Sequence, residues 1–350
     1  MWRTRAYRVE DLGPLAEFLV PLGDESFSSR LRGKVSAYYR WKYGNGPGES
    51  DRVRLAIGVD GLIGVVAMLP RRIKLGGQVL TAFEFGDLLT GPGYRRQGVF
   101  STLGREACEA SAAMGALSYV KPNADAAPAL LKHLGFRPLL ELETLARPIR
   151  VSRILAQRFG RWPFGAWGRP LDKLFAVRAS SGPPFLTREA IFGEEFDGLW
   201  EAVAGDYPAI VVRDRTYLEW RYRQNPTDYT VLAARDGSGR LRGYAVGLVV
   251  QWGARRIGYL VDILARREDR ATQVALARGI LRSCSDEGAQ TVHTWIAKES
   301  ASVQSTLRSA LRSVGFFHRG SDWVLWRPSL DDLPSDQRAW YLTMADFDGI

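Results

Sequence analysis

The sequence predicts an α/β (α+β) protein made of two tandem copies of one unit, each with a central mixed, mostly antiparallel β-sheet flanked by helices. Three observations support this prediction. The chain has 350 residues, which suits two domains of about 150 residues each. Short motifs recur at a nearly constant spacing, and the expected helices and strands follow the same order in both halves.

The repeat is most evident around two tryptophans. Trp41 and Trp220 stand 179 positions apart, each in an aromatic segment with a basic residue directly after the tryptophan. Two copies are too few for a solenoid, so the pattern indicates a duplicated domain. Further matches are the Gly-Phe pairs at 135–136 and 315–316, the Arg-Pro pairs at 147–148 and 327–328, and Asp87 with Asp262.

In the first copy, apolar patterns and tight turns predict a β-meander. The pairs at 60–61 and 76–77 are its turns, because they contain the glycines that two-residue hairpins favour. Val99, Leu103 and Ala107 then recur at helical spacing. The expected order is a helix at 10–22, strands at 55–59, 62–75 and 78–89, a helix at 99–114, a strand at 117–120, a last helix and a final strand.

The second copy repeats this order. Its expected elements are a helix at 194–204, strands at 230–234, 241–251 and 256–264, a helix, a strand at 291–296, a last helix and a final strand. We place the domains at 1–150 and 186–330, joined by a linker at 151–185 and followed by a C-terminal tail at 331–350.

Composition narrows the class of protein. The chain has two cysteines, which imply no disulfide framework, and its three histidines show no metal-ligand spacing, so no metal is expected. Charged residues interrupt the N-terminal stretch, and no apolar run approaches the roughly 20 residues that span a bilayer. We therefore expect a cytoplasmic protein. The net charge of +10 favours anionic partners without choosing among them.

The linker is both basic and aromatic. Arginines alternate with phenylalanines and tryptophans over residues 150–180. Such a pattern suits peripheral contact with a membrane or with an acidic carrier protein. The alternative is a linker that packs its aromatic side chains across both domains.

The most informative stretch lies between the third expected strand and the following helix. Residues 91–100 combine glycines, two arginines and a glutamine directly before the helix begins. A turn of this kind aims unpaired backbone N–H groups at one point, and the helix dipole adds positive potential there. Gly98 allows close backbone approach, and Arg95 and Arg96 supply charged donors. The pattern predicts a pyrophosphate site.

Here the sequence resembles the Gcn5-related N-acetyltransferase (GNAT) superfamily. Its loop, Arg/Gln-x-x-Gly-x-Gly/Ala, matches Arg95 to Phe100 except that Phe100 replaces the small residue. The resemblance implies two GNAT-like domains and acetyl-CoA, or another acyl-CoA, as co-substrate. The implied contacts are Arg95, Arg96, Gln97, Gly98, Val99, Phe100 and Ser101 for the pyrophosphate, Leu88, Leu89 and Thr90 for the pantetheine arm, and Asn123 from the family's late Asn…Gly-Phe signature.

The second copy departs from this motif. Its equivalent stretch, 265–271, contains no glycine and carries Glu268 and Asp269, which would repel a pyrophosphate. We expect the second domain not to bind coenzyme A and to serve a structural role, with a contribution to the acceptor pocket.

Catalysis by the family often uses a glutamate on the fourth strand as general base, and Glu84 has a matching position, 11 residues before Arg95. A partly apolar setting would raise its pKa toward the working pH. Asp87 is the second candidate, although its counterpart Asp262 favours a structural role. At the position where the family commonly has a tyrosine as general acid, this sequence has Leu131. We select Tyr119 as the substitute, with His133 and Tyr94 as alternatives.

The resemblance therefore implies an N-acetyltransferase or other acyltransferase that moves an acyl group from coenzyme A to an amine of a small-molecule or amino-sugar acceptor by direct attack. Two alternatives remain open: a transferase like the peptidoglycan-bridge (Fem-like) enzymes, which use aminoacyl-tRNA, and a non-catalytic coenzyme A-binding scaffold. Because Arg95 to Gly98 form a pyrophosphate motif that the tRNA-dependent enzymes generally lack, we expect no nucleic-acid partner.

Overall fold

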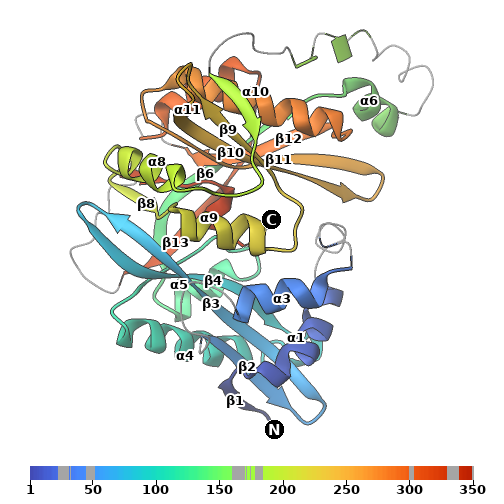
Figure 1. Cartoon of the computed structure of the whole chain (residues 1–350). Coiled ribbons are helices and arrows are strands. Elements are labelled where there is room, and N and C mark those ends of the chain that lie inside the picture. Colours follow the sequence, from blue (N-terminus) through green and yellow to red (C-terminus); the bar gives the residue numbers. More distant parts are fainter. Residues whose placement is uncertain are drawn as a thin grey trace.

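The computed structural model describes residues 1–22, 31, 33–44, 52–159, 170, 172–173, 175–177, 184–298, 303–328 and 339–348. In these residues the fold is one sheet of 14 strands with helices packed on it, and Figure 1 shows its two halves stacked one above the other. The predicted α/β class with a mixed, mostly antiparallel sheet is confirmed.

The first half contains every element that its sequence predicts. In chain order they are β1 (Arg3–Ala6), α1 (Leu12–Leu19), α3 (Val35–Gly44), β2 (Val53–Gly58), β3 (Gly61–Leu75), β4 (Gln78–Thr90), α4 (Val99–Ala113), β5 (Leu117–Val120), α5 (Ala127–His133) and β6 (Arg137–Pro148). The long β3–β4 hairpin turns at Gly76, whose φ of 57° is left-handed, as a tight glycine turn requires.

The second half repeats the set. Its elements are β7 (Phe185–Arg188), α8 (Glu195–Ala204), α9 (Arg215–Glu219) with the π-helical turn Trp220–Gln224, β9 (Thr230–Arg235), β10 (Leu241–Trp252), β11 (Arg255–Ala265), α10 (Arg270–Asp286), β12 (Thr291–Ala297), α11 (Ser305–Ser313) and β13 (Phe317–Arg327). Four short strands were not predicted: β1, β7, β8 (Ala209–Val211) and β14 (Trp340–Tyr341).

The order of the strands shows that the halves exchange their last strands. The order is β1-β2-β3-β4-β5-β13-β6-β12-β11-β10-β9-β7. Strand β5 of the first half pairs with β13 of the second, and β12 of the second half pairs with β6 of the first. The two exchanged strands also pair with each other at the centre. The domain limits 1–150 and 186–330 stay a prediction, because each half completes its sheet with a strand from the other.

The recurring Gly-Phe and Arg-Pro pairs meet across this exchange. Gly135 and Gly315 have left-handed φ values of 70° and 92°. An added Cβ would lie 3.5 Å from Arg327 Nε at Gly135 and 3.1 Å from Arg147 Nε at Gly315. Each half's arginine therefore covers the other half's glycine turn, which links the repeat seen in the sequence to the crossing of the two strands.

The C-terminal segment is a second connection between the halves. The sequence assigns a C-terminal tail to 331–350, and in its described part, 339–348, most side chains are buried. Trp340–Tyr341 pair with β8, and β8 pairs in turn with β3 of the first half. The segment then forms a 3-10 turn, Met344–Asp346, whose three residues are 1% exposed or less.

The linker is described mainly through α6 (Val151–Phe159), none of whose residues is buried. About half of the predicted contact region at 150–180 (160–169, 171, 174 and 178–180) lies outside the described residues, so that prediction rests on α6 and the few residues described after it. Within the part of the chain that is described, no helix combines the length and the apolar character needed to cross a bilayer.

Candidate active site

The site is built where β4 and β5 part. These parallel strands pair only from Ala82–Leu117 to Glu84–Tyr119. Strand β4 continues to Thr90, paired with β3 on its other edge. Beyond Glu84, no described strand pairs with the β5-facing edge of β4, so its backbone groups are available to a ligand. This is where the sequence predicts that Leu88, Leu89 and Thr90 hold the pantetheine arm.

A β-bulge in β4 bends the strand and sets the direction of this edge. The register with β3 shifts between Val65 and Ala67, opposite Asp87, whose φ of 45° is left-handed. The Asp87 carboxylate accepts a hydrogen bond from the Tyr43 hydroxyl and pairs with the buried ammonium of Lys42. These contacts hold a strained backbone whose cost is about 1–3 kcal/mol, which supports the structural role for Asp87.

The predicted pyrophosphate loop follows directly. The 3-10 turn Pro92–Tyr94 leads into it, and Gln97 Nε2 donates to the Gly93 carbonyl across it. Arg96 and Gly98 both have positive φ, 61° and 81°. Gly98 is the N-cap of α4, and no described side chain caps that helix end. Arg95 and Arg96 are exposed beside it.

The first residues of α4 have different surroundings. Val99 is buried against Gly64, where an added Cβ would lie 2.7 Å from Val99 Cγ1, so the glycine lets the helix approach β3 closely. Phe100 packs on the same core, and Ser101 is half-buried. Asn123 Oδ1 accepts from the Ala126 N–H at the start of α5, so its contact with the co-substrate stays a prediction.

Glu84 lies at the end of the β4–β5 pairing and is 4% exposed. Its Oε2 is 2.6 Å from Arg71 Nη2, and its Oε1 accepts from the Asp348 N–H at 2.6 Å. Burial raises the pKa of Glu84 to about 7, because removal from water disfavours the carboxylate more than Arg71 favours it. A carboxyl group with this pKa can exchange a proton near neutral pH.

Tyr119 lies opposite Glu84 in the strand pairing, but its hydroxyl donates to the Asp346 carbonyl at 2.9 Å. Burial raises the pKa of Tyr119 well above its ordinary value. Leu131 is 43% exposed on α5. The structure therefore brings Glu84 and Tyr119 together as strand partners, while His133 is exposed and Tyr94 is half-buried.

The equivalent helix end in the second half is already occupied. Asp269 is the N-cap of α10, and its carboxylate accepts from the Thr272 N–H at 3.1 Å and from the Thr272 hydroxyl at 2.8 Å. A side-chain carboxylate thus takes the place that an external anion would need. That the second half does not bind coenzyme A stays a prediction.

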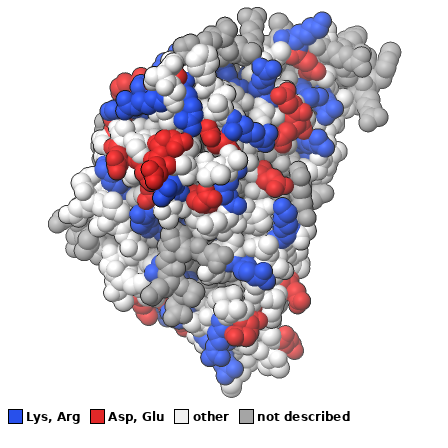
Figure 2. All heavy atoms as spheres, viewed as in Figure 1, with Lys and Arg blue, Asp and Glu red and all other residues white. Residues whose placement is uncertain are grey.

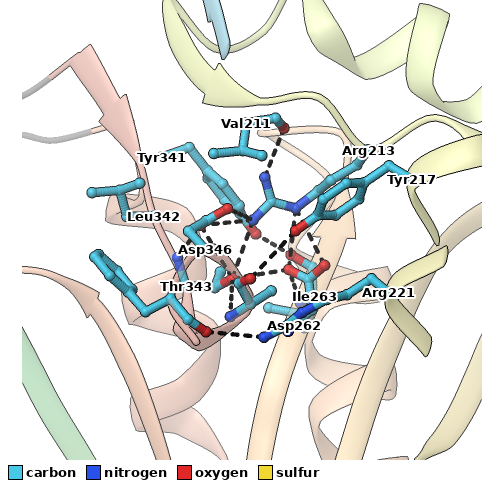
Figure 3. Close-up of polar contacts among 12 residues, drawn as sticks. Val211, Arg213, Tyr217, Arg221, Asp262, Ile263, Tyr341, Leu342, Thr343 and Asp346 are labelled. Carbon is cyan, nitrogen blue, oxygen red and sulfur yellow. Dashed lines mark hydrogen bonds and ion pairs between the residues drawn. The ribbon is translucent and has the colours of Figure 1, made fainter. Parts of the chain in front are cut away.

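The parting of strands in the second half is occupied too. Strands β11 and β12 pair only from Ile257–Thr291 to Tyr259–His293. The C-terminal segment enters beyond this point: the Tyr341 hydroxyl donates to the Ile263 carbonyl, and Gln304 Nε2 donates to the Leu342 carbonyl. Figure 3 shows the segment held against the strand that carries Asp262.

A buried ionic cluster fixes the segment. Arg213 is fully buried, with Nε 3.2 Å from both carboxylate oxygens of Asp262 and Nη2 2.8 Å from Asp346 Oδ2 (Figure 3). Thr343 and Tyr244 also donate to Asp262. Because each charge is paired and hydrogen-bonded, the cluster ties the segment to one position.

Sequence reasoning missed the charged residues near Glu84. Lys42 and Arg221 occupy the same place in the two repeats, each directly after the repeated tryptophan. Both contact Asp348, Lys42 through its ammonium and Arg221 through Nη1 at 3.9 Å. A basic residue conserved between the repeats in an aromatic segment was the signal that could have found them.

Residues 23–138 match the family model of the Acetyltransferase (GNAT) domain. This match covers about a third of the chain and lies within its first half. The match contains β4, the loop at 95–98 and α4, so the GNAT motif and the open helix end coincide.

Solved structures share the fold of the whole chain. N-myristoyltransferase from Saccharomyces cerevisiae, with bound myristoyl-CoA, is 14% identical over 97% of this chain and 88% of its own, with a TM-score of 0.65. A probable N-acyltransferase from Enterococcus faecalis is 13% identical over 94% and 73%, with a TM-score of 0.64. A GCN5-related N-acetyltransferase from Anabaena variabilis is 12% identical over 94% and 73%, with a TM-score of 0.61.

No curated protein matches this chain. At these identities the solved structures show that the fold is shared, and they leave the acceptor open.

Proposed function

We propose that the chain binds one acyl-CoA in its first half and transfers the acyl group to an amine. The observation that carries this proposal is the contrast between two equivalent positions. The helix end at Gly98 and the β4 edge beyond Glu84 are open, whereas the helix end at Thr272 and the β11 edge are filled by Asp269 and the C-terminal segment. Among the described residues, only the first half offers a place for the co-substrate.

In this proposal the pyrophosphate lies against the N–H groups at the start of α4, with Arg95 and Arg96 as charged donors. The pantetheine arm runs along Leu88 to Thr90 as an added strand, which directs the thioester toward Glu84. The buried hydroxyl oxygen Oγ1 of Thr90, which has no hydrogen-bond partner among the described residues, lies on this path and supports it.

The reaction is direct aminolysis of the thioester. The amine nitrogen attacks the carbonyl carbon and forms the C–N bond of an amide, and the C–S bond breaks. The amine loses one proton to Glu84, and coenzyme A departs as a thiolate. Because Glu84 Oε1 accepts from the Asp348 N–H, proton transfer includes a small shift of residues 347–348 that frees this oxygen.

The acceptor we propose is the amine of a small molecule or an amino sugar. Acetyl-CoA is the first acyl donor to examine, and longer acyl groups belong in the same panel because the yeast neighbour was solved with myristoyl-CoA. The cytoplasmic location and the absence of a nucleic-acid partner stay predictions.

The test is release of free coenzyme A thiol from acetyl- to myristoyl-CoA in the presence of an amine and amino-sugar panel. The Glu84→Gln variant should bind acyl-CoA like wild type and lose turnover about 100-fold or more. Glu143→Gln is the matched control, because Glu143 is equally buried and ion-paired, with Arg308, away from the site. Turnover that survives in Glu84→Gln would overturn the assigned base.

A further inference from the structure

The outer end of the second half carries a surface formed by α6, the tip of the β10–β11 hairpin and the end of α10. Gln157 Nε2 of α6 donates to the Ala254 carbonyl at the hairpin tip, and Arg150 Nη2 donates to the Ser285 carbonyl of α10. Arg256 Nη1 donates to the Glu287 carbonyl at the same helix end. Three elements far apart in sequence thus share one surface, which we call the basic end, and Figure 1 shows α6 beside the projecting hairpin.

The basic end combines charge with exposed aromatic rings. Phe159 is 55% exposed at the end of α6, and Trp252 is 43% exposed at the hairpin. Neither 151–159 nor 251–256 contains an acidic residue. The basic residues of this surface are Arg150, Arg153, Arg158, Lys173, Arg255, Arg256 and Arg282, against the acidic residues Asp172, Asp286 and Glu287.

The carboxylate nearest to α6 is already engaged. Asp172 accepts from the Ser152 N–H at 2.9 Å and from the Ser152 hydroxyl. The seven basic and three acidic residues of the basic end leave an excess of four positive charges. This is a large share of the net charge of the whole chain, which is +10. On the face in Figure 2, Lys and Arg are interspersed with Asp and Glu over the visible surface.

We propose that the basic end binds the surface of a membrane that carries anionic lipids. Arginines attract the headgroups, while Phe159 and Trp252 insert at the boundary between headgroups and acyl chains, where aromatic rings are favoured. The helix supports this geometry because α6 has half-buried Ile154 and Leu155 on one side and exposed Arg153 and Arg158 on another. The surface lies on a projecting hairpin and a helix. A deformable lipid surface can adapt to such a shape, whereas a second protein would have to be complementary to it.

The experiment is cosedimentation of the full chain with large vesicles of neutral phosphatidylcholine or of phosphatidylcholine with about one third phosphatidylglycerol. Wild type should sediment with the anionic vesicles, remain in solution with the neutral ones, and be released by high salt, because salt screens the attraction. Each arginine near an anionic surface contributes about a fivefold change in partition. Arg255→Glu with Arg256→Glu should therefore weaken binding at least 25-fold, roughly the product of two such losses.

The matched control is Arg105→Glu with Arg137→Glu, which changes the net charge equally at exposed positions of the first half. The proposal predicts that this control keeps most of the binding. Trp252→Ala leaves the charge unchanged and should still weaken binding several-fold, with a thermal unfolding midpoint like that of wild type. Equal loss in both charge-reversal variants, absence of binding to anionic vesicles, or binding only to an added acidic carrier protein would overturn the proposal.

Discussion

Trp41 and Trp220, 179 positions apart in the chain, stack with their ring centroids 4.8 Å apart and their planes 23° from parallel. Trp41 Nε1 also donates to the Trp220 carbonyl at 2.8 Å. The two repeated segments that revealed the duplication therefore meet each other. Arg71 and Arg221 lie over the two rings, so this stack joins the halves directly beside Glu84.

The stack should contribute strongly to stability. Trp41 is 3% exposed, so Trp41→Ala leaves a cavity between the halves and should lower the free energy of unfolding by about 3–5 kcal/mol. Trp323→Ala is the control, because Trp323 is 45% exposed, and should cost far less. Urea unfolding followed by circular dichroism measures both. Equal losses would contradict a structural role for the stack.

The ionic cluster should hold the C-terminal segment. Asp346→Ala leaves Arg213 buried with one carboxylate partner fewer, which should cost about 3–5 kcal/mol. Asp322→Ala removes the exposed ion pair with Lys121 and should cost at most about 1 kcal/mol. Denaturant unfolding of the two variants makes the comparison, and a small effect of Asp346→Ala would mean that the segment is held by apolar packing instead.

Gly98 should matter for affinity through its backbone. Its φ is 81° and an added Cβ meets open space, so Gly98→Ala introduces backbone strain without a clash. In the variant, adopting the left-handed backbone of the bound loop costs about 1 kcal/mol. The dissociation constant for acyl-CoA should therefore rise about fivefold. Gly239→Ala is matched, with φ 83° and open space in a turn of the second half, and should leave the affinity unchanged. Isothermal titration of both variants decides.

The raised pKa of Glu84 predicts two pH effects. If Glu84 is the base, kcat/KM should rise with pH through about 7, as the carboxyl group loses its proton, and Glu84→Gln should remove this rise. Stability should change in the opposite direction. The folded pKa lies above the ordinary 4.5, so the folded state binds more protons between pH 4.5 and about 7, and the free energy of unfolding falls as pH rises through this window.

The control for this second effect is the same substitution. Glu84→Gln should flatten that part of the stability profile, which is measured by urea unfolding at a series of pH values. An unchanged slope in the variant would show that another group is responsible.

The sequence predicted the repeating elements well because each has a local signature. Glycine-containing turns marked the ends of the strands in both meanders, and helical spacing of apolar residues located α4. The predicted bounds therefore agree with the structure to within a few residues. The loop at Arg95 to Gly98 was recognisable because its proposed function depends on consecutive residues and on the left-handed glycine Gly98.

The strand exchange could not be predicted in this way. Strands β6 and β13 come from equivalent positions in two copies, so each carries a pattern that fits beside either β5 or β12. The choice depends on how the halves meet, which no local pattern encodes. The C-terminal segment was missed for a related reason: its described part is ten residues long, and its burial depends on Arg213 and Asp262, which lie far away in sequence.

The central claim is that two equivalent positions have diverged, one to bind acyl-CoA and the other to be filled by the chain itself. The most direct measurement is the stoichiometry of acetyl-CoA binding by isothermal titration, with wild type beside Arg95→Glu. We predict one site per chain in wild type and none in the variant. Two sites per chain, or binding that Arg95→Glu leaves unchanged, would contradict the claim.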